Sequence, residues 1–85
     1  MELTLYTRTG CHLCEVAKTQ LEPLLREFSV VLREIDVDTD PALAARFSEE
    51  VPVLFLGARK VAKYRVDMKQ FRRLLEQTQK RSSAR

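Results

Sequence analysis

The only two cysteines of this 85-residue chain, Cys11 and Cys14, stand three positions apart where a strand-like segment gives way to a helix-like one. In a helical turn, side chains at i and i+3 lie on one face, so the sulfurs can join and separate without moving the rest of the chain. The first turn also presents unpaired N–H groups at the positive end of the helix dipole, which favours thiolate over thiol. The spacing predicts a reversible dithiol, with Cys11 as nucleophile and Cys14 as resolving thiol.

The apolar pattern around this pair predicts a β-α-β unit. Residues 2–7 read as a strand, and from Cys14 onward apolar residues follow steps of three and four, which predicts a helix that buries one stripe. That stripe consists of Ala17, Leu21, Leu24, Leu25 and Phe28. Pro23 removes one backbone hydrogen bond, so we expect a kink there or a helix that restarts. Residues 30–37 are rich in β-branched side chains and predict a second strand.

A short acidic segment follows, in which Asp36, Asp38 and Asp40 alternate. Alternating carboxylates could bind a cation, but no glycine or terminal glutamate follows at the spacing of an EF-hand loop. Asp40 followed by Pro41 is instead typical of an N-cap and the first residue of a helix. We therefore expect an acidic turn leading into a short helix, whose inward residues are Leu43, Ala44 and Phe47.

The remaining segments predict two strands and a helix. Residues 53–56 form a continuous apolar run, typical of a strand covered on both faces, and a turn at residues 57–58 leads to an edge strand over residues 60–64. A final helix over roughly residues 67–79 would bury Met68, Phe71, Leu74 and Leu75.

These elements predict an α/β fold with one mixed sheet. A β-α-β unit needs parallel strands and a right-handed crossover, whereas the tight last turn makes the final two strands antiparallel. A mixed four-stranded sheet with helices on both faces satisfies both constraints. The length fits one domain, which we expect over residues 1–79, followed by a flexible basic tail over residues 80–85.

The basic character of the chain is a property of its C-terminal end. The net charge is +3, but the residues from Arg72 onward carry +4 and the 71 before them carry −1. This distribution does not indicate a nucleic-acid partner. No run approaches the length of a membrane span, and the chain starts in a strand pattern without the features of a signal peptide. We therefore expect a cytoplasmic monomer without nucleic-acid or membrane partners. In a reducing compartment a C-x-x-C pair is catalytic or metal-binding rather than a structural staple.

Two motifs carry a resemblance to a known family. Residues 3–15 read Leu-Thr-Leu-Tyr-Thr-Arg-Thr-Gly-Cys-His-Leu-Cys-Glu, and residues 51–54 read Val-Pro-Val-Leu at the start of the buried strand. The chain resembles glutaredoxin, and more closely the short glutaredoxin-like family of the thioredoxin superfamily, up to about residue 78. The resemblance implies a thioredoxin-like fold of the glutaredoxin type, in the order β-α-β-α-β-β-α. It also implies a thiol-disulfide oxidoreductase that takes part in electron transport and cell redox homeostasis.

The resemblance also implies site residues beyond the dithiol. In the family the proline matching Pro52 follows a cis bond and faces the dithiol, so Val51 and Pro52 are expected to hold the substrate. Arg8 stands where glutaredoxins often carry a cation that contacts the glycine carboxylate of glutathione; it could also stabilise the Cys11 thiolate, or remain a solvated arginine on a loop. His12 replaces the proline of the family's usual Pro-Tyr pair. It could tune the thiolate, or be an exposed histidine without effect.

Two departures from the family pattern argue against strong glutathione binding. Glutaredoxins usually carry Thr before the Val-Pro pair, where this chain has Glu50, and Gly-Gly before the last helix, where it has Ala62 and Lys63. Side chains at the glycine pair would keep backbone amides away from the ligand's carboxylate, and Glu50 adds a negative charge near an anion. We expect no tightly bound cofactor and only weak use of glutathione as reductant. The expected partners are protein disulfides and a thiol reductant, either thioredoxin reductase or glutathione.

Two other functions stay open at this point. A metal or iron-sulfur module would need four ligands, and the chain offers only two cysteines with His12 wedged between them, so a second chain or outside thiols would have to complete the site. A redox-inactive interaction protein of the same fold is the second alternative. No Gly-rich phosphate loop or Ser-His-Asp set indicates another chemistry.

Overall fold

The computed structural model describes the backbone of residues 2–83 and the side chains of residues 2–79. Its elements follow the predicted order β-α-β-α-β-β-α, with one turn of 3₁₀ helix added before the second α-helix. They are β1 (Glu2–Thr7), α1 (His12–Glu27), β2 (Val31–Asp36), η1 (Val37–Thr39), α2 (Pro41–Phe47), β3 (Val53–Leu56), β4 (Arg59–Lys63) and α3 (Met68–Ser83).

The strands form the predicted mixed sheet, with four strands in the order β2-β1-β3-β4. Strand β1 is parallel to β2 and antiparallel to β3, and β4 is antiparallel to β3. The register pairs Val53, the first residue of β3, with Tyr6 on one side and Lys63 on the other. One end of the sheet, which we call the site end, therefore carries the C-terminal ends of β1, β2 and β4 and the start of β3.

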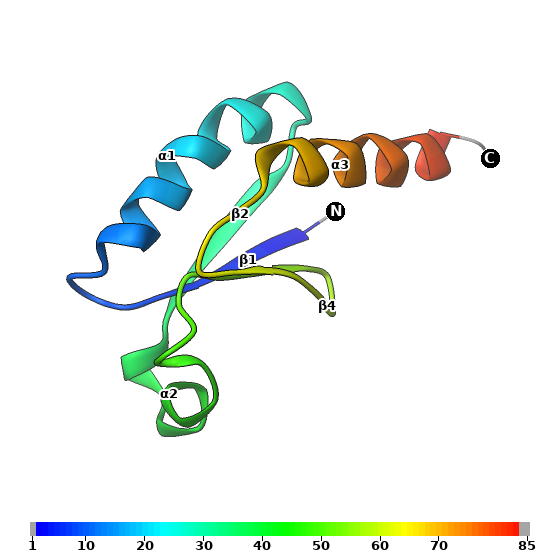
Figure 1. Ribbon diagram of the computed structural model, residues 1–85. Coiled ribbons are helices and arrows are strands. Elements are labelled where there is room, and N and C mark those ends of the chain that lie inside the picture. Colours follow the sequence, from blue (N-terminus) through cyan, green and yellow to red (C-terminus); the bar gives the residue numbers. More distant parts are fainter. Residues whose placement is uncertain (1, 84–85) are drawn as a thin grey trace.

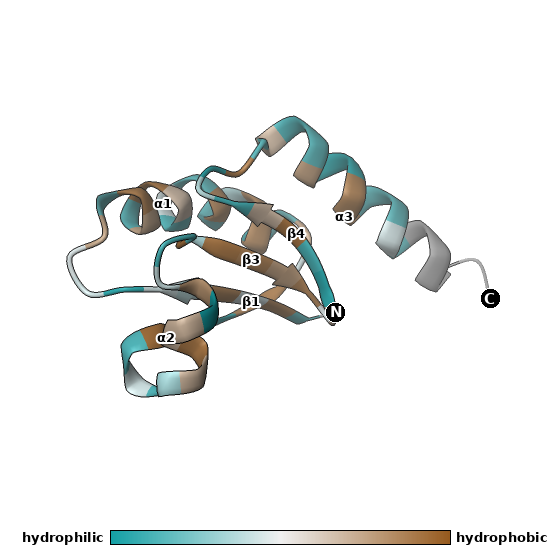
Figure 2. Cartoon of the chain, turned by 60° about the horizontal axis from the view of Figure 1, so that its bottom comes forward, coloured by the Kyte–Doolittle hydropathy of each residue, from teal (hydrophilic) through white to brown (hydrophobic). Residues whose placement is uncertain are grey.

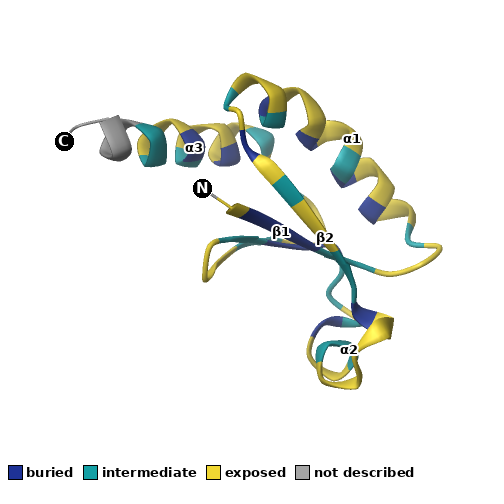
Figure 3. Cartoon of the chain, turned by 180° about the vertical axis from the view of Figure 1, so that it is seen from behind, coloured by how far each residue is buried: buried dark blue, intermediate teal, exposed yellow. Residues whose placement is uncertain are grey.

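Two apolar layers cover the sheet. Helices α1 and α3 lie over one face, and α2 packs against the other face near the site end (Figure 1). The larger core consists of Leu3, Leu5, Leu21, Leu24, Val30, Leu54, Phe71 and Leu75. The smaller core consists of Val37, Phe47 and Val53, against which Tyr6 and Phe55 pack; the Tyr6 and Phe47 rings stack with centroids 4.6 Å apart. The hydrophobic colouring of β1 and β3 in Figure 2 and the buried stripe of α1 in Figure 3 follow these layers.

Helix α1 runs through Pro23 without interruption, so of the two outcomes expected there, a kink or a restart, the restart is wrong and the kink stays a prediction. The stripe predicted for this helix is otherwise confirmed, since Ala17, Leu21 and Leu24 are buried. Pro23 lies on the exposed side, where water can satisfy the carbonyl that loses its N–H partner. Packing of the buried stripe on both sides of the proline then keeps the helix continuous.

Further boundaries differ from those expected, and one is that of β2, which spans Val31–Asp36 rather than residues 30–37 because Val37 belongs to η1. Strand β4 spans Arg59–Lys63 rather than residues 60–64, and α3 continues to Ser83 rather than ending at residue 79. Residues 76–83 contain mostly good helix formers and no glycine or proline, so nothing in them stops the helix. The first part of the expected tail is therefore helical, and residues 84–85 lie outside the described residues. The cap on α2 is confirmed: Asp40 Oδ1 accepts a hydrogen bond from the Ala42 N–H at 2.9 Å.

Leu54 provides a direct test of this core. It is fully buried in β3, so Leu54→Ala should lower the free energy of unfolding by about 2–5 kcal/mol through lost burial and a cavity. Val31→Ala on β2 is the control, because Val31 is 74% exposed; its cost should stay below about 1 kcal/mol. Urea unfolding followed by circular dichroism measures both, and equal losses would contradict the assignment of the core.

Candidate functional site

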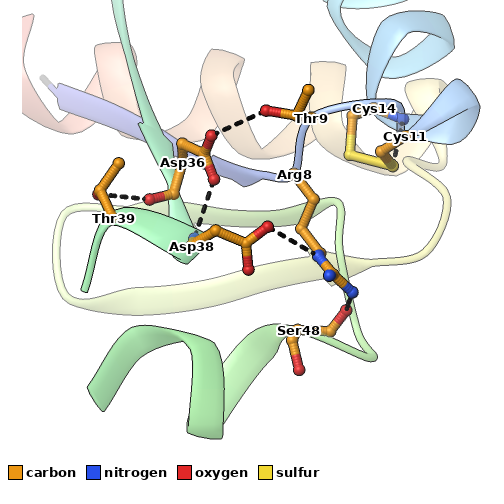
Figure 4. Close-up of polar contacts among 8 residues, drawn as sticks. All are labelled: Arg8, Thr9, Cys11, Cys14, Asp36, Asp38, Thr39 and Ser48. Carbon is orange, nitrogen blue, oxygen red and sulfur yellow. Dashed lines mark hydrogen bonds and ion pairs between the residues drawn. A yellow bond between two sulfur atoms is a disulfide. The ribbon is translucent and has the colours of Figure 1, made fainter. Parts of the chain in front are cut away.

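Cys11 and Cys14 are joined by a disulfide at the start of α1, with their Cα atoms 5.3 Å apart (Figure 4). Cys11 is the N-cap of the helix, and its Sγ accepts a hydrogen bond from the Cys14 backbone N–H at 3.1 Å. A sulfur thus takes the place of the side-chain oxygen that usually caps a helix. The N–H donates to the sulfur, and the positive end of the helix dipole lies at this N-terminus. Both effects favour a negative charge on Cys11 once the disulfide is reduced.

The two cysteines differ in accessibility. Cys11 is partly exposed, whereas Cys14 is only 1% exposed and lies on the buried stripe of α1. A substrate disulfide can reach the first sulfur but not the second. This asymmetry suits a nucleophile and a resolving thiol, although the two roles themselves remain predictions.

The loop between β1 and Cys11 is fastened to the segment after β2. Thr9 Oγ1 donates to Asp36 Oδ2 at 3.1 Å, and Arg8 Nε donates to Asp38 Oδ2 at 3.2 Å. The other oxygen of Asp36 accepts from the Asp38 backbone N–H at 2.9 Å, which holds the Asp36 carboxylate against this turn. Two of the three alternating acidic residues, Asp36 and Asp38, therefore anchor the cysteine loop, in addition to forming the predicted turn.

Arg8 is directed toward Asp38 and Ser48 rather than toward the two sulfurs (Figure 4). Its Nη1 donates to the Ser48 carbonyl at 3.5 Å. The Arg8 and Asp38 side chains are 45% and 46% exposed, so this ion pair contributes little stability but sets where the guanidinium points. To stabilise a thiolate or bind a ligand carboxylate, Arg8 would have to leave Asp38, and that predicted role remains a prediction.

The Val51–Pro52 bond is cis, as predicted. Pro52 is fully buried and directly precedes Val53, so the bond lies at the site end, where the loop carrying Cys11 also lies. The Pro52 carbonyl accepts from the Tyr64 N–H at 2.9 Å, which ties this bond to the segment after β4. The structure thus brings Val51 and Pro52 to the same end of the sheet as the dithiol, and their substrate-binding role is not tested by it.

The negative charge of Glu50 is balanced by a lysine. Lys60 Nζ donates to Glu50 Oε1 at 2.6 Å, and this hydrogen bond lowers the pKa of the Glu50 carboxyl. The positive charges of Lys63 and Arg46 act in the same direction. The negative charge of Glu50, which was expected to oppose glutathione binding, is therefore paired with a lysine of β4.

Sequence analysis did not single out Tyr64, which follows the Ala62-Lys63 pair at the end of β4. Its φ of +64° lies in the left-handed region that favours glycine. Its N–H donates to the carbonyls of Pro52 at 2.9 Å and Glu50 at 3.3 Å, which hold it in this conformation. No residue pattern signals a left-handed tyrosine, because the conformation is imposed by hydrogen bonds from a distant segment.

Sequence analysis also missed an open groove of about 500 Å³ between the first turns of α1 and the segment at residues 64–66, which we call the dithiol groove. Leu13, Val16 and Tyr64 line it together with His12 and Arg65. His12 is exposed at the first position of α1 and, among the described side chains, makes no hydrogen bond to either sulfur. Its predicted tuning role would therefore act through charge at short range and stays a prediction.

Among the side chains of residues 2–79, no three Cys, His, Asp or Glu residues are grouped so that they could hold a metal ion. Within residues 2–83, no helix has both the length and the apolar character needed to cross a membrane.

Comparisons with known proteins agree with this geometry. The family model for the Glutaredoxin-like domain (DUF836) matches residues 2–76. An uncharacterized protein of Mycobacterium tuberculosis is 34% identical over 71 residues, which cover 78% of this chain and 73% of that protein. A solved structure from X. campestris has a TM-score of 0.70 at 31% identity and covers 87% of this chain and 95% of its own. Thioredoxin 1 of Thermosipho africanus shares the fold, with a TM-score of 0.71 at 16% identity, over 98% of this chain and 99% of its own.

The family match spans β1 through most of α3, and the thioredoxin fold with a Cys11–Cys14 pair indicates a redox function. The chain therefore belongs to the family of the Glutaredoxin-like domain (DUF836) and has the thioredoxin fold.

Proposed function

We propose that this protein is a thiol-disulfide oxidoreductase that reduces protein disulfides or mixed disulfides with glutathione through Cys11 and Cys14. The observation that carries the proposal is the capping position of Cys11: its sulfur accepts the Cys14 N–H and is bonded to the sulfur of Cys14, and Cys11 is partly exposed whereas Cys14 is buried. Such an arrangement supports an ionised, reachable nucleophile together with a protected resolving thiol.

The reaction consists of two exchanges. The Cys11 thiolate attacks one sulfur of the substrate disulfide, that S–S bond breaks, and the departing sulfur leaves as a thiolate that takes up a proton. The Cys14 thiol then loses its proton and attacks Cys11 Sγ, which forms the internal disulfide and releases the second substrate thiol. The dithiol has given up two electrons, so a thiol reductant must return them before the next cycle.

The neighbouring residues take supporting roles in this proposal. Val51 and Pro52 hold the substrate chain at the site end, and Arg8 and His12 favour the thiolate when a substrate approaches. Arg8 can do so only after it exchanges Asp38 for a new partner. The protein binds no cofactor tightly, and its partners are protein disulfides and a thiol reductant. We place this activity in the cytoplasm, because a C-x-x-C dithiol is kept reduced there. We also expect the protein to act as a monomer without nucleic-acid or membrane partners.

Serine substitutions separate the roles of the two cysteines. Cys11→Ser should reduce turnover of a protein disulfide to background, because the attacking sulfur is gone. Cys14→Ser should instead accumulate a mixed disulfide with the substrate, visible by mass spectrometry without reducing agent. Undiminished turnover by Cys11→Ser would remove this mechanism, and circular dichroism of both variants controls for folding.

The identity of the reductant can be tested with two coupled assays. Because Ala62 and Lys63 occupy the position of the family's glycine pair, we expect slow turnover with glutathione and glutathione reductase, and faster turnover with thioredoxin reductase. The consumption of NADPH measures both under the same conditions. Robust turnover with glutathione would contradict the expectation.

The tuning role of His12 predicts a shift in the pKa of Cys11. His12→Ala should raise the apparent pKa of the Cys11 thiolate, followed through its ultraviolet absorbance in the reduced protein, since a nearby imidazole that favours the thiolate is lost. Gln20→Ala is the control, because Gln20 lines the same groove and carries no charge. An unchanged pKa in His12→Ala would reject the role.

A further inference from the structure

Exposed large apolar side chains gather in the dithiol groove, which holds three of the four found among the described residues. Leu13, Val16 and Tyr64 are 38%, 37% and 45% exposed, and all three line the dithiol groove. The fourth, Val31, lies on the edge strand β2. A cluster of exposed apolar side chains is typical of an interaction surface, whereas single exposed ones are ordinary.

The charged side chain that lines this groove, Arg65, is basic. Arg65 is exposed and, among the described residues, has no carboxylate partner. Glu15 lines a hollow that shares His12 and Val16 with the groove, but its carboxylate pairs with Lys18 at 3.2 Å. The groove therefore combines an apolar wall with an unneutralised guanidinium, which complements a negative charge.

The left-handed backbone of Tyr64 would favour glycine, so the tyrosine side chain must contribute something that glycine lacks. A left-handed φ costs a non-glycine residue about 1–2 kcal/mol, which glycine avoids. The hydrogen bonds that hold the segment use only the Tyr64 N–H, which glycine also has. What tyrosine adds to glycine here is therefore its ring, which forms part of the groove and has the Lys63 Nζ 5.4 Å from its centroid.

Building on the proposed oxidoreductase function, we propose that the dithiol groove selects substrates by the sequence around their disulfide. An apolar side chain of the substrate packs against Leu13, Val16 and Tyr64, and a neighbouring acidic side chain pairs with Arg65. The partner is thus a protein segment that carries a disulfide together with an apolar and an acidic residue. His12 and Leu13, which line the groove, directly follow Cys11 in the sequence, so the groove begins beside the expected nucleophile.

The test uses four short disulfide-linked peptides that differ at two positions beside the cysteine, with leucine or serine at one and glutamate or lysine at the other. The reduced protein, freed of reductant, is mixed with each peptide, and the release of peptide thiol is followed by stopped flow. The leucine-glutamate peptide should react at least about tenfold faster than the serine-lysine peptide. Each variant is judged by the ratio between its own peptide rates, so changes in its general reactivity cancel.

Three variants assign this selectivity to the groove. Arg65→Glu should reverse the preference, so that the lysine peptide reacts faster than the glutamate peptide. Arg59→Glu makes the same charge change at the start of β4, outside the groove, and should keep the preference. Tyr64→Gly should bring the ratio of leucine to serine rates close to one, and because the backbone there favours glycine, it should keep the fold.

The outcomes distinguish the two proposals. If the protein reduces hydroxyethyl disulfide but reacts equally with all four peptides, or if Arg65→Glu and Arg59→Glu behave alike, the groove proposal is overturned and the oxidoreductase proposal stands. If it reduces neither the small disulfide nor any peptide, both are overturned. A concentration-dependent dimer in sedimentation that Tyr64→Gly disrupts would assign the groove to a second copy of the chain, which also overturns the substrate proposal.

Discussion

The hydrogen bond from the Cys14 N–H to Cys11 Sγ is the contact on which the rest of the site depends. It makes one residue both the cap of α1 and the exposed sulfur, so the helix begins where the chemistry is expected. Because the same turn buries Cys14 against the core, a single local geometry sets up a reachable sulfur, a protected partner and a field that favours negative charge. Losing helical structure at this point would remove all three together.

The sheet brings the other segments to this turn. Parallel pairing of β1 with β2 places Asp36 opposite Thr7, and from there Asp36 and Asp38 anchor the cysteine loop through Thr9 and Arg8. Antiparallel pairing with β3 places the cis Val51–Pro52 bond at the same end, and the Tyr64 N–H links that bond to the wall of the groove. Most of these contacts join residues that lie far apart in sequence, so they depend on the strand register being correct.

Local signals in the sequence predicted much of this structure. The apolar periodicities, the Asp40 cap and the order of elements are determined by neighbouring residues, and the family resemblance supplied the cis bond at Pro52. The features that escaped prediction depend on tertiary partners: the left-handed φ of Tyr64 is held by hydrogen bonds from its N–H to the carbonyls of Glu50 and Pro52. The pairing of Arg8 with Asp38 belongs to the same class, since no local pattern shows which carboxylate the arginine meets.

The central claim is that Cys11, and not Cys14, is held as a thiolate near neutral pH. The most direct measurement is the rate at which iodoacetamide alkylates each cysteine of the reduced protein as a function of pH, with mass spectrometry assigning the modified residue. The account predicts that Cys11 is modified first, with an inflection clearly below the ordinary cysteine pKa of about 8.5, while Cys14 reacts slowly at every pH. Equal rates at the two cysteines, or an inflection for Cys11 at or above that value, would contradict it.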